Sequence, residues 1–195
     1  MTDPIREMRD HWDERWGGGL AAEASTQLLR VSQLLLGRLD GILAEFGLTL
    51  ARYEALTLLT FSRKSELPLS KLGERLMIHP ASVTSIVDKL VEFEYVERVP
   101  HHSDRRVVLA RVTTSGRQIV ERASAVIIAA NNGFAGLTDD DLETLIALSV
   151  RFRDAVGDVG STDNSVDGST GVKGGGRRVD QSRVRRARIT RSRSA

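Results

Sequence analysis

The chain has 195 residues, of which 41% are hydrophobic and 28% are charged, with no cysteine and a net charge of +2. This composition fits one domain with a sizeable core, and the lack of cysteine excludes disulfides and cysteine-ligated metal sites. No stretch reaches the length of a membrane span. The first residues, MTDPIREMRDHWDERW, contain no apolar run of the kind found in a secretory signal, so we expect a cytoplasmic protein.

Positive charge is concentrated at the C-terminus. Residues 157–195 hold nine Lys/Arg and four Asp, which leaves a net charge of −3 for residues 1–156. Because this tail is rich in Gly, Ser and Arg and nearly lacks large apolar residues, we expect it to be disordered. It is either an ordinary solvated segment or an arm that attracts DNA nonspecifically. Any nucleic-acid surface on the rest of the chain must be a local patch.

Four helices flank the centre of the chain. Residues 1–19 form a polar leader or short extra helix that ends in GGG. Apolar residues at three- and four-residue steps then predict helices over 20–46, 48–62, 115–130 and 137–156. Gly47 is the expected stop of the first of these, and Thr49 and Thr138 are the expected N-caps of the second and the last.

The central segment predicts two short helices joined by a tight turn. Ser70 is expected to cap the first, over 71–76, and Pro80 suits the first position of the second, over 80–93. The second helix has a polar face and an opposite apolar face. The apolar residues that it is expected to bury are Val83, Ile86, Val87 and Leu90. This pattern is the outline of a helix-turn-helix.

Two β-rich segments follow, 95–99 and 107–112, joined by the polar loop PHHSDRR. They predict a β-hairpin with a long tip. A hairpin directly after a helix-turn-helix is a wing, whose tip lies near the minor groove and the phosphates of DNA. Arg105 and Arg106 suit a narrow minor groove. Asp104 would be repelled by phosphate, so we expect it to pair with an arginine or with loop amides.

The predicted fold class is mainly α with a small β-hairpin wing. It is a winged helix-turn-helix whose core covers about 48–114 within a domain over 20–156. The candidate DNA-binding residues are His79, Ser82, Thr84, Ser85, Lys89, His101, His102, Ser103, Asp104, Arg105 and Arg106. Three of them are histidines, but no cysteine or acid stands at ligand spacing, so we expect no metal or other cofactor. No enzyme is expected, since phosphate loops, Ser/His/Asp arrangements and paired carboxylates are missing.

The segments LTLARYEALTLL, LSKLGERLMIHPASVTSIVDKLVEFEYVERV and LARVTTSGR resemble the MarR family of winged-helix transcription regulators, over roughly residues 28–155. The wing pattern of that family is Asp-x-Arg, a strand, and Leu/Val-Thr-x-x-Gly. It is met by Asp104, Arg106, Val112, Thr113 and Gly116. The resemblance implies N- and C-terminal dimerisation helices and a homodimer on pseudo-palindromic operator DNA. Wide apolar stripes on the first and last helices agree.

The predicted function is therefore a sequence-specific DNA-binding regulator, a repressor that a small effector releases. The alternative is a nonspecific architectural DNA-binding protein driven by the basic tail. The leader HWDERWGG resembles a urate-responsive branch of the family, and this likeness implies an effector site. Trp12 or Trp16 would supply its aromatic ring, Glu54 its acid and Arg98 one of its two arginines.

The position of the second arginine in that branch is occupied by Ile86. A small aromatic or phenolic effector of low charge therefore fits better than an anion. The alternative for the two tryptophans is that they only pack the leader onto the core.

Overall fold

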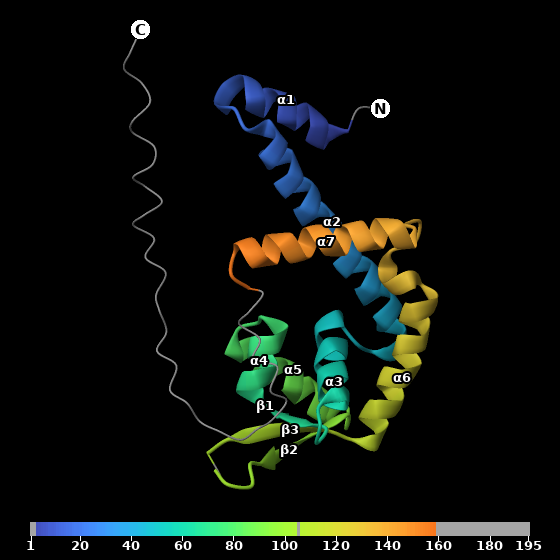
Figure 1. Ribbon diagram of the computed structural model, residues 1–195. Helices are drawn as coiled ribbons and strands as arrows, with labels where there is room; N and C mark the ends of the chain where they lie inside the picture. The colour runs from blue at the N-terminus through green and yellow to red at the C-terminus, as the bar shows by residue number, and fades with distance from the viewer. Residues whose placement is uncertain (1–2, 105, 159–195) are drawn as a thin grey trace. The chain divides into compact units, whose positions relative to one another are not determined.

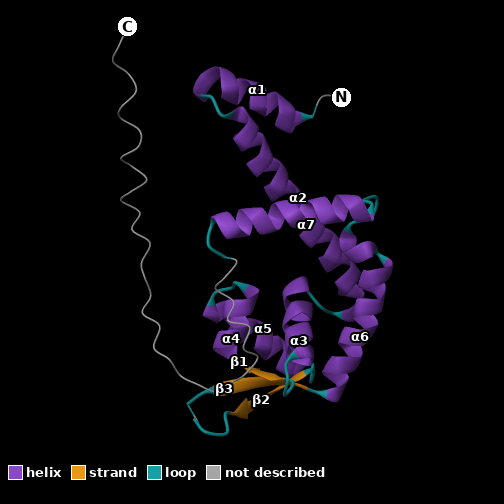
Figure 2. Cartoon of the chain, in the orientation of Figure 1, coloured by secondary structure: helices purple, strands orange, loops and turns teal. Residues whose placement is uncertain are grey.

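The computed structural model describes residues 3–104 and 106–158, which all belong to one unit of the chain (Figure 1). The elements in chain order are α1 Pro4–Trp16, α2 Gly19–Leu43, η1 Ala44–Phe46, α3 Leu50–Phe61, β1 Glu66–Pro68, α4 Leu69–Leu76, α5 Pro80–Glu92, β2 Val96–Pro100, β3 Val108–Val112, α6 Thr114–Ala129, η2 Asn131–Gly133 and α7 Asp139–Ala155. Helices predominate around one small sheet, which confirms the predicted fold class (Figure 2). The predicted disordered tail lies, from residue 159 onward, outside the described residues.

The sheet is antiparallel, with the strand order β1-β3-β2. Strands β2 and β3 form the predicted hairpin, in a register that pairs Val96 with Val112. Strand β1, which pairs Glu66 with Arg111, is an addition to the predicted elements. A strand of three residues is too short to show the alternation by which strands are recognised in a sequence.

The first long helix is shorter than predicted. It ends as α2 at Leu43, and the residues up to Phe46 form the 3-10 turn η1. Gly47 follows with a φ of 68°, in the left-handed region that glycine enters without steric cost, as predicted for the stop. Side chains recur at three-residue steps in both kinds of helix, so apolar spacing does not separate the last α turn from a 3-10 turn.

Helix α4 begins earlier than predicted. Ser70 is not its N-cap, because β1 runs directly into the helix and places Pro68 at that position. Ser70 lies exposed in the first turn instead. The predicted N-caps Thr49 and Thr138 are confirmed, since each side chain accepts a hydrogen bond from a backbone N–H in the first turn of its helix.

The hydrophobic core lies where α2 to α6 meet the sheet. Its largest fully buried side chains are Leu43, Leu56, Leu59, Leu72, Leu90 and Val87. Helix α5 buries Val83, Val87 and Leu90 as its spacing predicts, whereas Ile86 is only half-buried. Each fully buried Val or Leu contributes roughly 1.5–3 kcal/mol. This packing fixes α5 against its neighbours and leaves its polar face outward.

The wing joins α6 through a close contact at Gly116. A Cβ atom on this residue would lie 2.2 Å from the carbonyl oxygen of Tyr95, closer than any side chain can approach. Thr113 is the N-cap of α6, and its hydroxyl donates to the carbonyl of Glu94 at 2.8 Å. The Thr-x-x-Gly pattern therefore holds the turn after α5 against the first turn of α6.

Helix α1 lies along the N-terminal part of α2, at the end opposite to the sheet (Figure 1). Ile5 is buried there, and Arg9 pairs with Glu23 of α2 at 3.0 Å. Helix α7 has no buried residue. Among the described residues, every helix is too short or too polar to cross a membrane.

Candidate nucleic-acid interface

Helix α5, the recognition helix of the helix-turn-helix, begins with a histidine cap. His79 Nδ1 accepts a hydrogen bond from the N–H of Ala81 at 3.2 Å, and Pro80 occupies the first helical position. This bond needs an unprotonated Nδ1, so the neutral ring carries its proton on Nε2. The exposed ring of His79 thus offers a donor beside the helix N-terminus, where the helix dipole favours anions.

The polar face of α5 is exposed. It contains Ser82, Thr84 and Ser85, three of the predicted DNA-binding residues. In the described part of the chain, the hydroxyl groups of Ser82 and Ser85 have no hydrogen-bond partner, whereas Thr84 donates to the carbonyl of Pro80 at 3.2 Å. The two serines are therefore available to an external partner.

The charged residues of α5 are engaged within the chain. Lys89 Nζ lies 2.7 and 2.8 Å from the two carboxylate oxygens of Glu92 and 5.2 Å from the ring centre of Phe93. Asp88 is paired with Arg98 at 2.6 Å. A contact between Lys89 and a DNA phosphate must therefore compete with Glu92.

The wing tip is held by Asp104. Its Oδ1 accepts hydrogen bonds from the backbone N–H of Arg106 at 3.0 Å and from its Nε at 3.2 Å. The backbone bond, and then the guanidinium, hold the pKa of Asp104 below its usual range. The predicted pairing of Asp104 is confirmed. The Arg106 side chain is 92% exposed, which leaves its other donors free to reach DNA, and Arg105 lies outside the described residues.

Two histidines precede the tip. The ring centres of His101 and His102 are 4.3 Å apart, and His101 Nδ1 accepts from the backbone N–H of Ser103 at 3.3 Å. These contacts order the segment that leads to Asp104. Among the residues that the structure describes, no group of three His, Asp or Glu side chains is placed to hold a metal ion.

Arg111, which is not among the predicted site residues, links all three strands. It contacts Glu66 Oε2 through Nε at 2.8 Å and Nη2 at 2.6 Å, and Glu97 Oε1 through Nη1 at 3.3 Å. The three residues lie directly opposite one another in the sheet. The hydrogen bonds that Arg111 donates to Glu66, above all, raise the pKa of Arg111. Arg111 is the one charged residue of β3, and its pairing with Glu66 could not be predicted without knowledge of β1.

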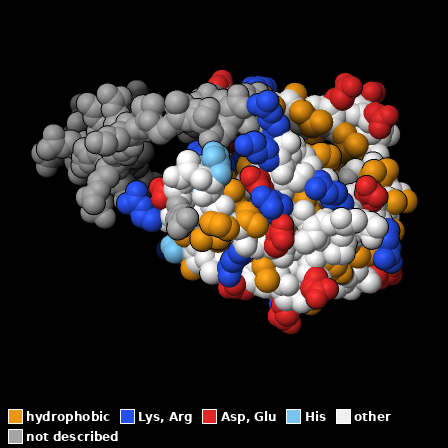
Figure 3. All heavy atoms as spheres, turned by 90° about the horizontal axis from the view of Figure 1, so that it is seen from below, with side chains coloured by type: hydrophobic (Ala, Val, Ile, Leu, Met, Phe, Trp, Pro, Cys, Tyr) orange, Lys and Arg blue, Asp and Glu red, His pale blue; other side chains and the backbone are white. Residues whose placement is uncertain are grey.

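Charges of both signs are mixed on the face in Figure 3, which views the molecule from below the sheet. Lys/Arg side chains stand among Asp/Glu and apolar ones instead of forming one basic patch. This distribution agrees with the negative net charge of residues 1–156. Attraction to DNA by the described part must therefore depend on local contacts.

Within one chain, the four residues that the resemblance proposes for an effector site do not lie together. Trp12 and Trp16 contact each other edge to face at 5.0 Å on α1, far from the sheet that contains Arg98 (Figure 1). Trp16 is 67% exposed, and neither tryptophan belongs to the hydrophobic core. Glu54 lies on α3, where partial burial raises its pKa.

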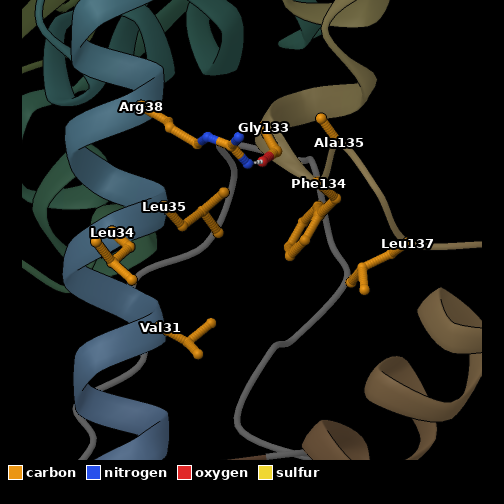
Figure 4. A pocket seen from close by; sticks show the side chains of 8 residues that line it. All are labelled: Val31, Leu34, Leu35, Arg38, Gly133, Phe134, Ala135 and Leu137. Atoms are coloured by element: carbon orange, nitrogen blue, oxygen red, sulfur yellow. Dashed lines mark hydrogen bonds between the residues drawn. The ribbon is translucent and has the colours of Figure 1, made fainter. Parts of the chain in front are cut away.

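An apolar pocket of about 420 Å³ lies between α2 and the η2 elbow that connects α6 to α7 (Figure 4). Its lining residues are Val31, Leu34, Leu35, Arg38, Gly133, Phe134, Ala135 and Leu137. Arg38 Nη1 donates to the carbonyl of Gly133 at 2.9 Å. A Cβ on Gly133 would lie 2.7 Å from a Leu35 methyl group, so this glycine lets the elbow touch α2. None of the proposed effector residues lines the pocket.

An exposed helix face with free hydroxyl groups, next to a hairpin that ends in an exposed arginine, is the arrangement of a winged helix-turn-helix domain. The MarR family profile matches residues 48–108, and the chain belongs to the MarR family of transcription regulators. This family consists of transcription regulators, not enzymes.

Three relatives illustrate the match. Sco5413, a MarR family transcriptional regulator from Streptomyces coelicolor, is 42% identical with a TM-score of 0.68, over 73% of this chain and 99% of Sco5413. YhbI, an HTH-type transcriptional regulator from Bacillus subtilis, is 33% identical over 86 residues, or 44% of this chain and 54% of YhbI. The chain thus spans about half the length of YhbI.

The third relative was solved with DNA. Sco3205, also a MarR family regulator from Streptomyces coelicolor, has a TM-score of 0.67 at 21% identity, over 73% of this chain and 91% of Sco3205. At this identity the likeness concerns the fold alone.

Proposed function

We propose that the protein regulates transcription by inserting α5 into the major groove of operator DNA and placing the wing tip at the adjacent minor groove. The main support is the free hydroxyl groups of Ser82 and Ser85 on a helix that packs against strand β2 of the wing, whose tip exposes Arg106. Asp104 positions the tip. The other proposed contacts are His79, Thr84, Lys89, His101, His102, Ser103 and Arg105. Phosphate contacts supply most of the affinity, and base contacts supply the specificity.

The active form is proposed to be a homodimer. Helices α2, α6 and α7 expose apolar side chains that nothing in the described chain covers. The set is Leu20, Leu28, Leu29, Val31, Leu34, Leu36, Val126, Ile128, Ile146, Leu148, Val150 and Phe152. An apolar surface of this extent is typical of an interface. Val31 and Leu34 also line the pocket of Figure 4, so a second copy is its proposed occupant.

A two-fold dimer would present two copies of α5, and the operator is therefore proposed to be pseudo-palindromic. In this arrangement the protein acts as a cytoplasmic repressor. A small aromatic or phenolic effector would release it, provided that the effector binds the DNA-free arrangement of the two wings more tightly than the DNA-bound one. The pair Arg98–Asp88 supports this route, because it connects a proposed effector residue to the recognition helix.

Selection of bound duplexes from a random library tests the proposal. The full chain should enrich inverted repeats, and small aromatic compounds should then release the selected duplex. The control is a chain truncated after Asp158, which keeps every described residue and removes the rest of the basic tail. Sequence preference should survive the truncation even if affinity falls. If the full chain enriches no sequence, nonspecific coating of DNA is the better account.

A further inference from the structure

The recognition helix has a single side chain, Lys89, of the kinds that usually read one base pair through two hydrogen bonds. Helix α5 contains no Arg, Asn or Gln, whereas bidentate contacts to guanine use Arg or Lys and those to adenine use Asn or Gln. Its single lysine, Lys89, is held by Glu92 at 2.7 Å. Two-bond recognition of adenine is therefore not available to α5, and that of guanine is left to Lys89, which must first leave Glu92.

In the first two turns after Pro80, α5 exposes short side chains, namely Ala81, Ser82, Thr84 and Ser85. Ser82 and Ser85 can donate or accept, so their hydroxyl groups distinguish the bases poorly. Thr84 is different, because its hydroxyl donates its one hydrogen to the carbonyl of Pro80 at 3.2 Å. Thr84 thus offers an external partner acceptor lone pairs and a methyl group, and Ala81 offers a methyl group only.

Short side chains also allow the backbone of a helix to approach the base edges closely. In the major groove, thymine is the one standard base that carries a methyl group, at C5, and apolar side chains recognise it by contact. We infer that α5 recognises its half-site through thymine C5-methyl groups that contact the methyl groups of Thr84 and Ala81. This inference rests on the proposed placement of α5 in the major groove.

Replacement of thymine by deoxyuridine tests the inference, because it removes the C5-methyl group and leaves base pairing unchanged. The probe is the tightest duplex recovered from the random library, with each dT of one half-site replaced in turn by dU. We expect about a fourfold loss of affinity at one or two positions, the equivalent of one buried methyl group. Uniform affinity across the whole dU series would overturn the inference.

Two variants assign the contact to Thr84. Thr84→Ser keeps the hydroxyl and removes the methyl group, so it should bind the dT duplex about fourfold more weakly. At one position, replacement of dT by dU should then cause no further loss of affinity. Thr84→Val keeps the methyl group and replaces the hydroxyl with a second methyl group, so the loss of affinity on dU replacement should remain. If replacement of dT by dU weakens the binding of Thr84→Ser as much as that of the wild type at every position, Thr84 does not make the methyl contact. Thermal melts of both variants check that they fold.

The outcomes separate this inference from the function on which it rests. If the library yields no preferred duplex, the proposed DNA interface fails first. If a preferred duplex exists but responds only to changes at guanine positions, the interface stands and recognition through methyl groups is wrong.

Discussion

The guanidinium of Arg98 lies 2.6 Å from the carboxylate of Asp88, and this contact joins strand β2 of the wing to the exposed side of α5. The pair neutralises a negative charge on the helix that is proposed to enter DNA. Loss of Arg98 would leave that carboxylate unpaired close to the phosphates, where like charges repel.

We therefore expect Arg98→Met to weaken operator binding by about 1 kcal/mol. The double variant Arg98→Met with Asp88→Asn should restore the affinity, because it removes the unpaired charge. Titrations of the selected duplex at fixed salt measure both effects. If the double variant binds as weakly as Arg98→Met, charge neutralisation is not the role of Arg98.

The exposed arginine of the wing tip, Arg106, should contribute more to operator binding than Arg98. Arg106→Ala is expected to weaken operator binding by about 1–3 kcal/mol, the usual loss for one groove contact. Arg6→Ala is the matched control, because Arg6 is an exposed arginine on α1, at the other end of α2 from the sheet. Equal losses for the two variants at one salt concentration would show that only overall charge is involved.

The order of the wing tip should also depend on pH. The pKa of Asp104 is lowered by the backbone N–H and the guanidinium of Arg106, so its ordering effect is complete above the ordinary pKa and is lost as pH falls through the lowered value. An NMR titration of the Asp104 carboxyl carbon measures this midpoint. A midpoint at or above the ordinary value of 3.8 would contradict the hydrogen-bonded tip. Asp104→Asn should weaken operator binding at neutral pH.

Much of this interface follows from the sequence, because it depends on local patterns. The periodic apolar residues predicted α5, and a polar loop between two β-rich segments predicted the wing. Asp104 and Arg106 stand two residues apart in one loop, so their pairing was open to prediction. Thr49 and Thr138 cap their helices by bonds within a single turn.

Other features depend on residues that are distant in the sequence. Arg111 reaches Glu66 only because β1 joins the sheet, and a strand of three residues gives no periodic signal. The contact of Gly133 with Leu35 likewise requires the return of the η2 elbow to α2. The proposed effector residues were assigned by resemblance, and within one chain α1, which contains Trp12, lies apart from β2, which contains Arg98 (Figure 1).

The close contact at Gly116 gives a prediction about folding. Gly116→Ala should lower the free energy of unfolding by about 1–3 kcal/mol, because its Cβ would collide with the Tyr95 carbonyl oxygen. Gly41→Ala is the control, since Gly41 lies within α2 with no atom near its Cβ position, and it should raise stability by about 0.5–1 kcal/mol. Urea denaturation measures both. If Gly116→Ala is as stable as the wild type, the backbone at Tyr95 can move away from residue 116 at little cost in free energy.

The dimer surface can be tested without a large effect on the single chain. Leu34 is 61% exposed in the described chain, so Leu34→Glu should leave the fold intact and separate the proposed dimer into monomers. Phe61, which is 80% exposed at the end of α3, provides the control substitution Phe61→Glu. Sedimentation measures the mass of each variant. If Leu34→Glu remains dimeric, α2 does not form the interface at this point.

The most direct test of paired recognition is the mass of the complex between the full chain and its selected duplex. We predict two chains on each duplex, with half-sites about 10–10.5 base pairs apart or a multiple of that spacing. A single chain on each duplex, or full affinity for one isolated half-site, would contradict the account.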